Sequence, residues 1–331
     1  MTLTREGAQP VAVDSFEIQA HVGQDLALTS AREAAVAVAG GDVACGRVTL
    51  PFDGGWMRLM GAVVPSLDLF GYKEFHLSAE NTVRYAVHLF RLSDGAPLGV
   101  VDGALVTPLR TAATAAVASE WFFGRGRSVR LAVVGSGAEA QSGVRALNSV
   151  LALKDVRVTS RTKANRDTCA DVLRAGTGLP ISSVANIRDA VEGADMVYLA
   201  TNSGGAVVAS SQDLRGVPFV ASIGSTLPAQ RELHGDVLAG AGCVVVDTWD
   251  VLEESGDALA ATQLGLTRDR VMLLGGMRDR SWHDAVGQVV YKSIGSPEQD
   301  LVLAHRIIDA AQATGDFGRP MEPLSTIKQN L

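Results

Sequence analysis

The sequence has little of what several classes of protein require. It contains only 3 cysteines in 331 residues, widely spaced and without a C-x-x-C pair, so we expect no disulfide framework and regard all of them as small buried hydrophobes. Its 6 histidines show no ligand spacing, so no metal site is expected. Aromatic residues make up 5% and charged residues 20%, whereas hydrophobic residues reach 47%, which is typical of a soluble globular protein. The length predicts two domains.

Positive charge and long apolar runs are also lacking. With 36 acidic against 29 basic residues the net charge is −7, which argues against the basic surface that binds nucleic acid. The longest run of apolar and small residues, Val217 to Ala229, is shorter than the ~18 residues of a membrane span. Acidic residues interrupt the N-terminal region, so no secretory signal is expected. We therefore expect a cytoplasmic protein without nucleic-acid or membrane partners.

The first third of the chain predicts an α+β domain. Three segments are rich in strand-forming residues: Arg47–Phe52, Phe70–Leu77 and Thr82–Leu92. The turn Ser93-Asp94-Gly95 joins the last of them to Pro97–Val101 as a hairpin. Strong helix formers then predict a long helix over Thr107–Trp121, and Gly124-Arg125-Gly126-Arg127 marks a boundary.

A different pattern begins after that boundary. Arg130–Val134 is strand-like, Gln141–Leu153 is compatible with a helix, and the turn Gly135-Ser136-Gly137-Ala138-Glu139-Ala140 lies between them. Strand and helix candidates continue to alternate: Val156–Ser160, Lys163–Ala175, Asp195–Ala200, Val217–Ile223 and Cys243–Val246. This alternation predicts a doubly wound parallel sheet, the Rossmann fold. A last apolar-periodic helix is expected over Asp300–Thr314, with a tail from Gly318 onward.

The glycine turn is a G-x-G-x-x-A motif. Its first glycine, Gly135, permits the tight turn, and Gly137 lets the backbone approach a pyrophosphate. Ala140 is small enough for the helix to pack on the strand. With a strand before it and a helix after it, the motif predicts dinucleotide binding, and a simple packing turn is the alternative.

The second strand of this fold ends without the carboxylate that binds the ribose hydroxyls of NAD. Ser160-Arg161-Thr162-Lys163 stands there instead, and its hydroxyl and two cations suit a 2′-phosphate. We therefore expect NADP(H) to be preferred and NAD(H) to be possible. The alternative is a solvated basic turn.

Taken one at a time, Arg47, Lys73 and Arg110 are ordinary surface cations. Together with a series of ordered motifs they make the chain resemble the ornithine cyclodeaminase/μ-crystallin family, which includes cyclodeaminases, alanine dehydrogenases and ketimine reductases. The resemblance covers nearly the whole chain. It rests on the spacing of Arg47 to Lys73 and on these segments: Val101–Gly103, Leu105–Ala113, Val134–Ala138, Leu199–Asn202, Ile223-Gly224, Arg231–Leu233, Tyr291–Gly295 and Gln299–Leu301.

The resemblance implies roles for individual residues. Arg47 would bind the substrate carboxylate, Lys73 would be the catalytic lysine, and Thr82 and Arg110 would face cofactor and substrate. Positions expected beside the nicotinamide are Thr201, Asn202, Ile223, Gly224, Lys292 and Gly295. It also implies a homodimer and a discontinuous first domain, with residues 1–122 and 302–331 for substrate binding and dimerisation and residues 123–301 for the dinucleotide.

Two further positions bear on the reaction. Cyclodeaminases of this family carry an aspartate where this sequence has Thr226, and a hydroxyl cannot act as a base near neutral pH. Simple hydride transfer to a C=N carbon needs only a carboxylate clamp and a proton donor, which Arg47 and Lys73 would supply, with neighbouring cations lowering the pKa of the lysine. Arg58 could reach a second acidic group or could be an ordinary strand-face arginine.

We therefore predict an NAD(P)H-dependent reductase that converts a small α-imino acid to the L-amino acid, or the reverse dehydrogenase. The alternatives are an ornithine- or lysine-type cyclodeaminase and a non-catalytic binder of a small ligand, as the resemblance to μ-crystallin allows.

Overall fold

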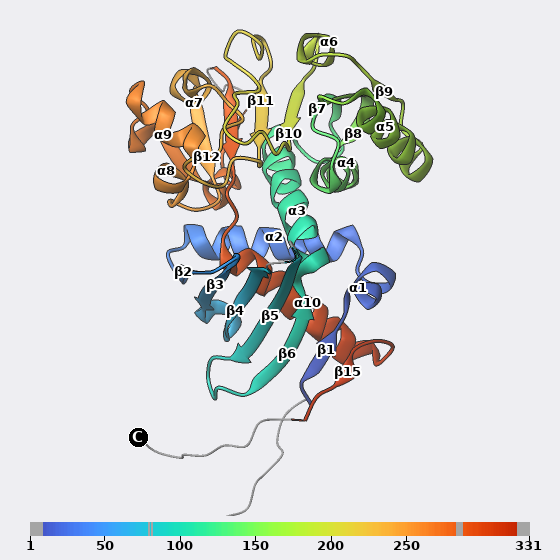
Figure 1. The fold of residues 1–331 in the computed structure, drawn as a ribbon, viewed down its shortest axis with the longest axis vertical. Coiled ribbons are helices and arrows are strands. Elements are labelled where there is room, and N and C mark those ends of the chain that lie inside the picture. Colours follow the sequence, from blue (N-terminus) through green and yellow to red (C-terminus); the bar gives the residue numbers. More distant parts are fainter. Residues whose placement is uncertain (1–8, 79, 81, 283–286, 323–331) are drawn as a thin grey trace, which may run out of the picture. The chain divides into compact units, whose positions relative to one another are not determined.

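The computed structural model describes residues 9–78, 80, 82–282 and 287–322. The chain divides into two compact units, a first unit of residues 1–110 and 296–331 and a second unit of residues 111–295 (Figure 1). The boundaries between the units, after residues 110 and 295, fall earlier in the chain than the expected domain boundaries after residues 122 and 301. One lies within helix α3 (Gly103–Phe123), and the other precedes helix α10 (Pro297–Thr314), which packs as a whole against the first unit.

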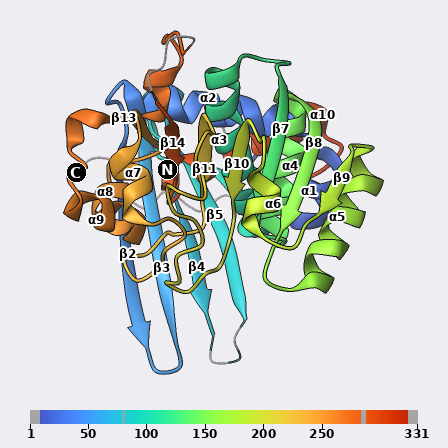
Figure 2. The same cartoon turned by 90° about the horizontal axis from the view of Figure 1, so that it is seen from above.

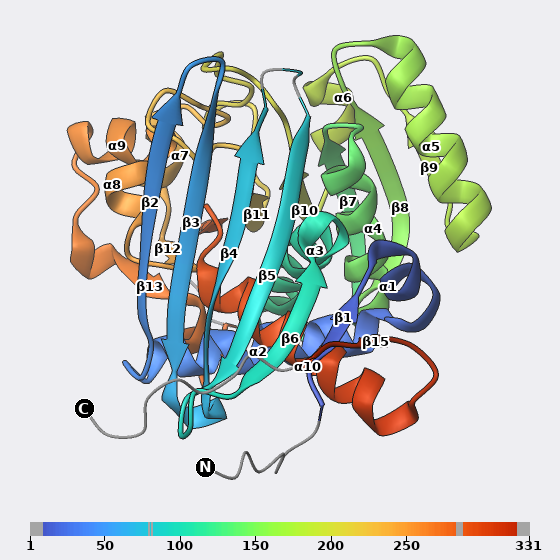
Figure 3. The same ribbon diagram turned by 60° about the horizontal axis from the view of Figure 1, so that its bottom comes forward.

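The first unit is built on a seven-stranded sheet in the order β15-β1-β6-β5-β4-β3-β2 (Figure 3). Its strands are β1 (Val11–Val13), β2 (Ala44–Phe52), β3 (Gly55–Val64), β4 (Leu69–Leu77), β5 (Val83–Arg91), β6 (Pro97–Asp102) and β15 (Arg319–Pro320). Strands β2 to β6 form an antiparallel meander, and β1 runs parallel to β6. Strand β3, which the sequence did not single out, lies between two strands that it did. The expected tail contains β15, which pairs with β1.

One face of this sheet is covered by helix α10, against which α2 (Gln24–Ala39) packs in turn. Helix α2 buries a stripe of small and apolar residues at helical spacing, including Ala27, Leu28, Ala31 and Ala34. A short helix, α1 (Ser15–His21), begins at Asp14, whose carboxylate accepts the amide hydrogens of Phe16 and Glu17.

The two faces of the sheet differ because side chains alternate along each strand. Met60, Val87 and Val101 point to the helix-covered face and are buried. Val48 and Leu50 on β2 belong to the other face and are half exposed, at 47% and 51%. The sheet therefore has one packed face and one face with exposed apolar side chains.

The second unit contains an eight-stranded, all-parallel sheet in the order β13-β12-β14-β11-β10-β7-β8-β9. Its strands are β7 (Ser128–Val134), β8 (Ala152–Thr159), β9 (Ile181–Ser183), β10 (Met196–Leu199), β11 (Phe219–Ser222), β12 (Cys243–Val246), β13 (Val271–Leu273) and β14 (Val289–Lys292). Strands β10 and β11 are buried along their whole length, as expected for a parallel sheet covered on both faces. The predicted Rossmann fold is confirmed.

Helices surround this parallel sheet. They are the later part of α3, α4 (Ala138–Val150), α5 (Lys163–Thr177), α6 (Ile187–Val191), α7 (Gly235–Gly240), α8 (Val251–Glu254) and α9 (Gly256–Gln263). Figures 1 and 2 show α4, α5 and α6 around the β7–β9 half of the sheet and α7, α8 and α9 around the β12–β13 half. Helix α4 ends at Val150, because the chain turns at Leu151 into β8, so the expected helix up to Leu153 was too long.

Other expectations concern single residues and segments. Cys169 is buried and Cys243 is half-buried, but Cys45 lies exposed on β2, so not all cysteines are core residues. Within the part of the chain that the structure describes, no cluster of side chains could hold a metal ion. No helix of those same residues is long and apolar enough to cross a membrane.

Candidate active site

Lys73 is the centre of the candidate site in the first unit. It lies on β4 on the helix-covered face, and only 2% of the residue is exposed. Its ammonium donates to Asp300 Oδ1 at 2.9 Å and to Thr107 Oγ1 at 2.7 Å. Nζ also lies 5.3 Å and 5.4 Å from the ring centres of Phe75 and Tyr85. Carboxylate, hydroxyl and ring faces all stabilise the charged amine, so Lys73 is held as an ammonium in one position.

Asp300, in the first turn of α10, was not among the residues that the sequence singled out for the site. It is fully buried and accepts from Arg110 Nε at 3.4 Å as well as from Lys73. Arg110 also donates to Gln299 Oε1 at 3.1 Å. Burial by itself would raise the pKa of Asp300, but Arg110 and Lys73 outweigh it and hold that pKa below its usual value.

This arrangement changes the expected electrostatics of Lys73. The sequence suggested neighbouring cations that lower the pKa of Lys73, whereas the structure places a carboxylate between Lys73 and Arg110. A signal was available, since Asp300 stands in the Gln299–Leu301 segment that carried the family resemblance. Periodicity assigned that segment only to a helix.

The strand register places Arg47 and Arg58 on the same face as Lys73. Arg47 and Lys73 both pair with Met60, one from each side, so they stand in one row across the sheet. Arg58 stands in the neighbouring row and donates from Nε to Thr49 Oγ1 at 2.8 Å. Thr82 is exposed in the turn between β4 and β5, where its amide donates to Ser78 Oγ.

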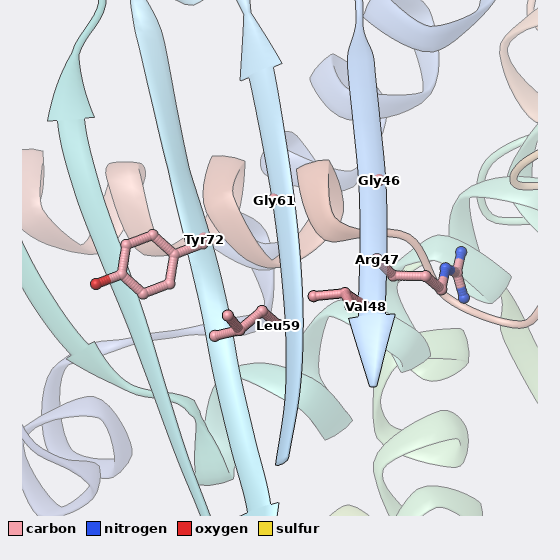
Figure 4. A pocket seen from close by; sticks show the side chains of 6 residues that line it. All are labelled: Gly46, Arg47, Val48, Leu59, Gly61 and Tyr72. Carbon is pink, nitrogen blue, oxygen red and sulfur yellow. The ribbon is translucent and has the colours of Figure 1, made fainter. Parts of the chain in front are cut away.

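The opposite face of the sheet carries an open hollow of about 470 Å³ lined by Gly46, Arg47, Val48, Leu59, Gly61 and Tyr72. Figure 4 shows the side chains of Val48, Leu59 and Tyr72 side by side, while Arg47 leaves its strand in the other direction. The hollow therefore belongs to the apolar face and is distinct from the row that holds Lys73.

In the second unit, the glycine turn has the geometry that the motif predicts. Gly135 has φ +128°, and a Cβ there would lie 2.2 Å from the carbonyl oxygen of Ala200. Gly137 caps α4, and a Cβ there would meet nothing within 4 Å, so its backbone is open to a ligand. Ser136, Ala138 and Glu139 continue the turn into α4, and Ala140 is fully buried.

The close packing of α4 on the sheet depends on another glycine that the motif did not include. A Cβ on Gly143 would lie 2.2 Å from the Tyr198 ring on β10. The open cradle at Gly137 and the N-terminal turn of α4 fit a pyrophosphate.

The segment after β8 is exposed, as a phosphate site requires. Arg161 and Thr162 are exposed, and Arg161 makes no hydrogen bond or ion pair with the described residues. Lys163 pairs with Asp167 at 2.6 Å, but its side chain is 78% exposed, and such surface pairs are weak. Ser160 is half-buried and its carbonyl accepts from Arg166.

A fully buried glutamate, Glu232, ties together loops at the ends of β10 and β11. Its Oε1 accepts from the amide and hydroxyl of Thr201 at 2.6 Å and 2.8 Å. Its Oε2 accepts from Ser222 Oγ at 2.8 Å and from the Gly224 amide at 2.7 Å. Next to them in the chain, Asn202 is exposed and Ile223 is buried. Glu232 thus fixes Thr201 and Gly224, two of the positions expected beside the nicotinamide.

Lys292 is held inside the same network. It is fully buried, lies 3.3 Å from Asp257 Oδ2 and donates to Ser222 Oγ at 3.1 Å. Asp257 also accepts the amides of Glu232 and Leu233. The amine of Lys292 therefore points into the core, where it contacts Ser222 and Asp257.

Asp247 at the end of β12 holds the loop that contains Gly295. Its Oδ2 accepts from Ser293 Oγ at 2.6 Å and from the Gly295 amide at 2.8 Å. Gly295 has φ +77°, a conformation that favours glycine. This carboxylate was also missing from the sequence-based set of site residues.

Thr226 forms its hydrogen bonds with Gln230, four residues further along the same loop. Both its amide and its hydroxyl donate to Gln230 Oε1, at 3.1 Å and 3.3 Å. A threonine hydroxyl in this arrangement can orient a group but cannot deprotonate an ammonium.

Residues 14–315 match the model of the Ornithine cyclodeaminase/mu-crystallin family. The chain is 26% identical to the Delta(1)-pyrroline-2-carboxylate reductase of Bacillus cereus (strain ZK / E33L) over 283 residues, 81% of this chain and 86% of that protein. It is 26% identical to the Ketimine reductase mu-crystallin of Mus musculus over 314 residues, 91% and 97% of the two chains. The structure of Thermococcus litoralis Delta(1)-pyrroline-2-carboxylate reductase in complex with NADH and L-proline superposes with a TM-score of 0.84 at 21% identity, covering 94% of this chain and 100% of that one.

Proposed function

Because the chain belongs to the ornithine cyclodeaminase/mu-crystallin family, we propose that it is an NAD(P)H-dependent reductase of a small α-imino acid. The product is the L-amino acid, and the reverse dehydrogenation uses the same groups. The observation that carries this proposal is the buried ammonium of Lys73, fixed by Asp300 and Thr107 on a sheet face that also presents Arg47. The names of the two curated relatives, a pyrroline-2-carboxylate reductase and a ketimine reductase, support the same reaction class.

Each residue of the first unit has a separate task in this reaction. Arg47 binds the substrate carboxylate, and Lys73 donates a proton from Nζ to the imine nitrogen. Asp300 and Thr107 act as positioning residues, since they aim the ammonium and stabilise its charge. Bound NAD(P)H supplies the hydride for the C=N carbon. Addition of one hydride and one proton converts the imine to the amine.

The cofactor is assigned to the second unit on the fit of its glycine turn. Gly135, Ser136, Gly137 and the first turn of α4 would hold the pyrophosphate, since a Cβ at Gly137 would occupy open space. Thr201 and Gly224, fixed by Glu232, would bind on the nicotinamide side.

We propose that NADPH is preferred over NADH because Arg161 and Lys163 are exposed and cationic at the end of β8. A lost phosphate–arginine pair costs on the order of 1.5–3 kcal/mol, or about 10- to 150-fold in affinity. Titration of both cofactors by nicotinamide fluorescence, with the wild-type chain and Arg161→Gln, measures this difference. Equal affinities of the wild-type chain for both cofactors would remove the argument.

Thr226 separates reduction from cyclodeamination. A cyclodeaminase must deprotonate a distal ammonium so that it can attack the imine, and the Thr226 hydroxyl, which donates to Gln230, does not provide that base. A purely binding role, the other alternative, would not require a proton donor as precisely held as Lys73.

The activity is tested by NADPH oxidation at 340 nm with piperideine- and pyrroline-2-carboxylate and with pyruvate, glyoxylate or oxaloacetate plus ammonia or methylamine. With the keto acids we expect oxidation that also requires the amine, and with the two cyclic imines we expect oxidation without added amine. Ammonia release from ornithine with catalytic amounts of NAD would instead identify a cyclodeaminase.

We further propose a cytoplasmic homodimer. The buried side chains of α10 already pack inside one protomer. The apolar face of the first unit's sheet, where Val48, Leu50 and Phe52 are exposed, is therefore the better candidate for the dimer contact. Light scattering at micromolar concentration should give twice the mass of one chain, and the monomer mass would disprove it.

A further inference from the structure

The strand order of the second unit indicates where each end of a dinucleotide would lie. From β7 the sheet continues to β8 and β9 on one side, and β10 then lies on the other side of β7. In such a sheet a ligand binds outside the carboxyl ends of the strands, where the strand order reverses. With the pyrophosphate at the glycine turn after β7 and the adenosine at the end of β8, the nicotinamide would lie at the loops after β10 and β11.

These loops are in direct contact with the glycine turn and with each other. A Cβ on Gly135 would lie 2.2 Å from the carbonyl oxygen of Ala200, the residue before Thr201. A Cβ on Gly224, in the loop after β11, would lie 2.3 Å from the carbonyl oxygen of Thr201. Thr201 therefore lies between the glycine turn and the loop that contains Gly224.

Glu232 fixes the direction of the hydrogen bonds in these loops. It is fully buried, and each of its two oxygens accepts one backbone amide and one hydroxyl hydrogen. A carboxylate has no hydrogen to donate, so the hydroxyl of Thr201 must direct its own hydrogen to Glu232 Oε1. Thr201 is half-buried, and its hydroxyl oxygen can then only accept a hydrogen bond from a ligand.

A closed ring of buried groups holds Glu232 in this orientation. Lys292 Nζ donates to Ser222 Oγ at 3.1 Å and lies 3.3 Å from Asp257 Oδ2. Ser222 in turn donates to Glu232 Oε2, and Asp257 Oδ1 accepts the backbone amide of Glu232 at 2.9 Å. All four residues are fully buried. Such a ring is rigid, because a buried polar group that loses its partner is costly.

We infer that Glu232 is a positioning residue for the cofactor, because it makes the Thr201 hydroxyl an acceptor for the carboxamide NH2 of the nicotinamide. The carboxamide offers one acceptor, its oxygen, and one donor group, its NH2, and only the donor group matches Thr201 Oγ1. A fixed carboxamide also fixes the plane of the ring from which the hydride leaves. The inference rests on the proposed function and specifies which group of the cofactor this loop recognises.

Cofactor analogues that differ only at the carboxamide test this inference. The 3-acetylpyridine analogue of NADP⁺ has a methyl group in place of the NH2, whereas the thionicotinamide analogue keeps the NH2 and replaces the oxygen by sulfur. Isothermal titration calorimetry measures the Kd of each for the wild-type chain, in the NAD⁺ series if NAD⁺ binds more tightly. We expect the acetylpyridine analogue to bind about 3- to 10-fold more weakly than the parent cofactor, as for one lost neutral hydrogen bond, and the thionicotinamide analogue to bind within about 2-fold of it.

Substitution of Thr201 assigns this preference for the NH2 to its hydroxyl. Thr201→Val keeps the branched shape and removes the hydroxyl, so the parent cofactor and the acetylpyridine analogue should bind with nearly equal Kd. Thr201→Ser should restore the preference. Thr262→Val, which removes a hydroxyl that donates to the carbonyl oxygen of Ala258 within α9, is the matched control and should leave the preference unchanged.

Substitution of Glu232 tests its positioning role. Each of its oxygens faces a backbone amide, so either orientation of a glutamine would set its NH2 against an N–H group. Glu232→Gln should therefore weaken the binding of NADP⁺ by about 10-fold or more and abolish the preference for the NH2. The Kd of 2′,5′-ADP, which lacks the nicotinamide half, should change by less than about 2-fold, whereas general damage to the second unit would weaken both ligands.

The outcomes separate this inference from the proposed function. If the wild-type chain binds the acetylpyridine analogue as tightly as the parent cofactor, or if Thr201→Val keeps the wild-type preference, the inference is wrong while the reductase stands. An equal loss of NADP⁺ and 2′,5′-ADP binding in Glu232→Gln would also overturn it, and if that variant does not fold, the Thr201 variants and the analogues still decide. If the wild-type chain binds neither NADP⁺ nor NAD⁺, the proposed function fails and the inference fails with it.

Discussion

Substitution of Asp300 by asparagine tests the ion cluster on which the proposed site depends. The side chain keeps its shape and one hydrogen-bond acceptor but loses its charge, so Lys73 and Arg110 remain as two buried cations. At an effective dielectric constant near 20, each contact, at 2.9 Å and 3.4 Å, amounts to about 5–6 kcal/mol of attraction before desolvation is counted. Loss of one partner from a buried ion pair typically costs about 3–5 kcal/mol, which is the net destabilisation we expect near pH 7.

The expected pH dependence has a definite sign. Because the folded chain lowers the pKa of Asp300, the stabilisation is present above the unfolded value of about 3.9 and is lost as the pH falls through the folded value. Asparagine does not titrate, so the difference between the two proteins should be constant from pH 7 to about pH 5 and should narrow below about pH 4.

Urea unfolding followed by circular dichroism measures the change, and hydrogen exchange of the β4 amides assigns it to the first unit. Asp94→Asn is the matched control, since it removes an exposed carboxylate paired with Arg91 and should have a much smaller effect. If Asp300→Asn does not fold, Lys73→Met in the same chain removes one of the two uncompensated cations and should restore part of the lost stability. The reasoning would be refuted if Asp300→Asn and Asp94→Asn lowered the free energy of unfolding equally and the loss did not depend on pH.

Four other substitutions test the remaining parts of the site. Lys73→Met should lower kcat for imine reduction by ~10²–10⁴ while the Kd for NADPH, measured by fluorescence, stays the same, and a parallel loss of cofactor binding would contradict its role as proton donor. Thr226→Ala should change kcat/KM by less than about 10-fold, because it removes only a hydroxyl that donates to Gln230, and a loss as large as that of Lys73→Met would indicate an essential role. Gly137→Ala should weaken NADPH binding and leave the melting temperature nearly unchanged, whereas Gly143→Ala should destabilise the second unit by about 1–3 kcal/mol because its Cβ collides with Tyr198.

Local patterns in the sequence were sufficient for most of the fold of the second unit. The order of strand, glycine turn and helix between Arg130 and Leu153 specifies a parallel βαβ unit because periodicity and turn chemistry act within a few residues. The same local reasoning gave strands at β4, β5 and β6 and the hairpin between the last two, but it did not single out β3 or β14. Both are inner strands of their sheets, and their assignment depends on the strands that pair with them on either side.

The sequence also named Arg47 and Lys73 through motif spacing and resemblance, and Arg58 from its place between them, but not the groups that hold them. The partners of Lys73 and Arg110 lie 227 and 190 positions away on α10, and Glu232 joins Thr201 to Gly224 across 31 and 8 positions. A carboxylate acquires such a role only when packing removes its water and places cations or amides against it. The sequence thus determined which cations are available for an imino acid, and the tertiary structure decided that Asp300 fixes the lysine among them, because burial and charge pairing between distant segments exist only in the folded chain.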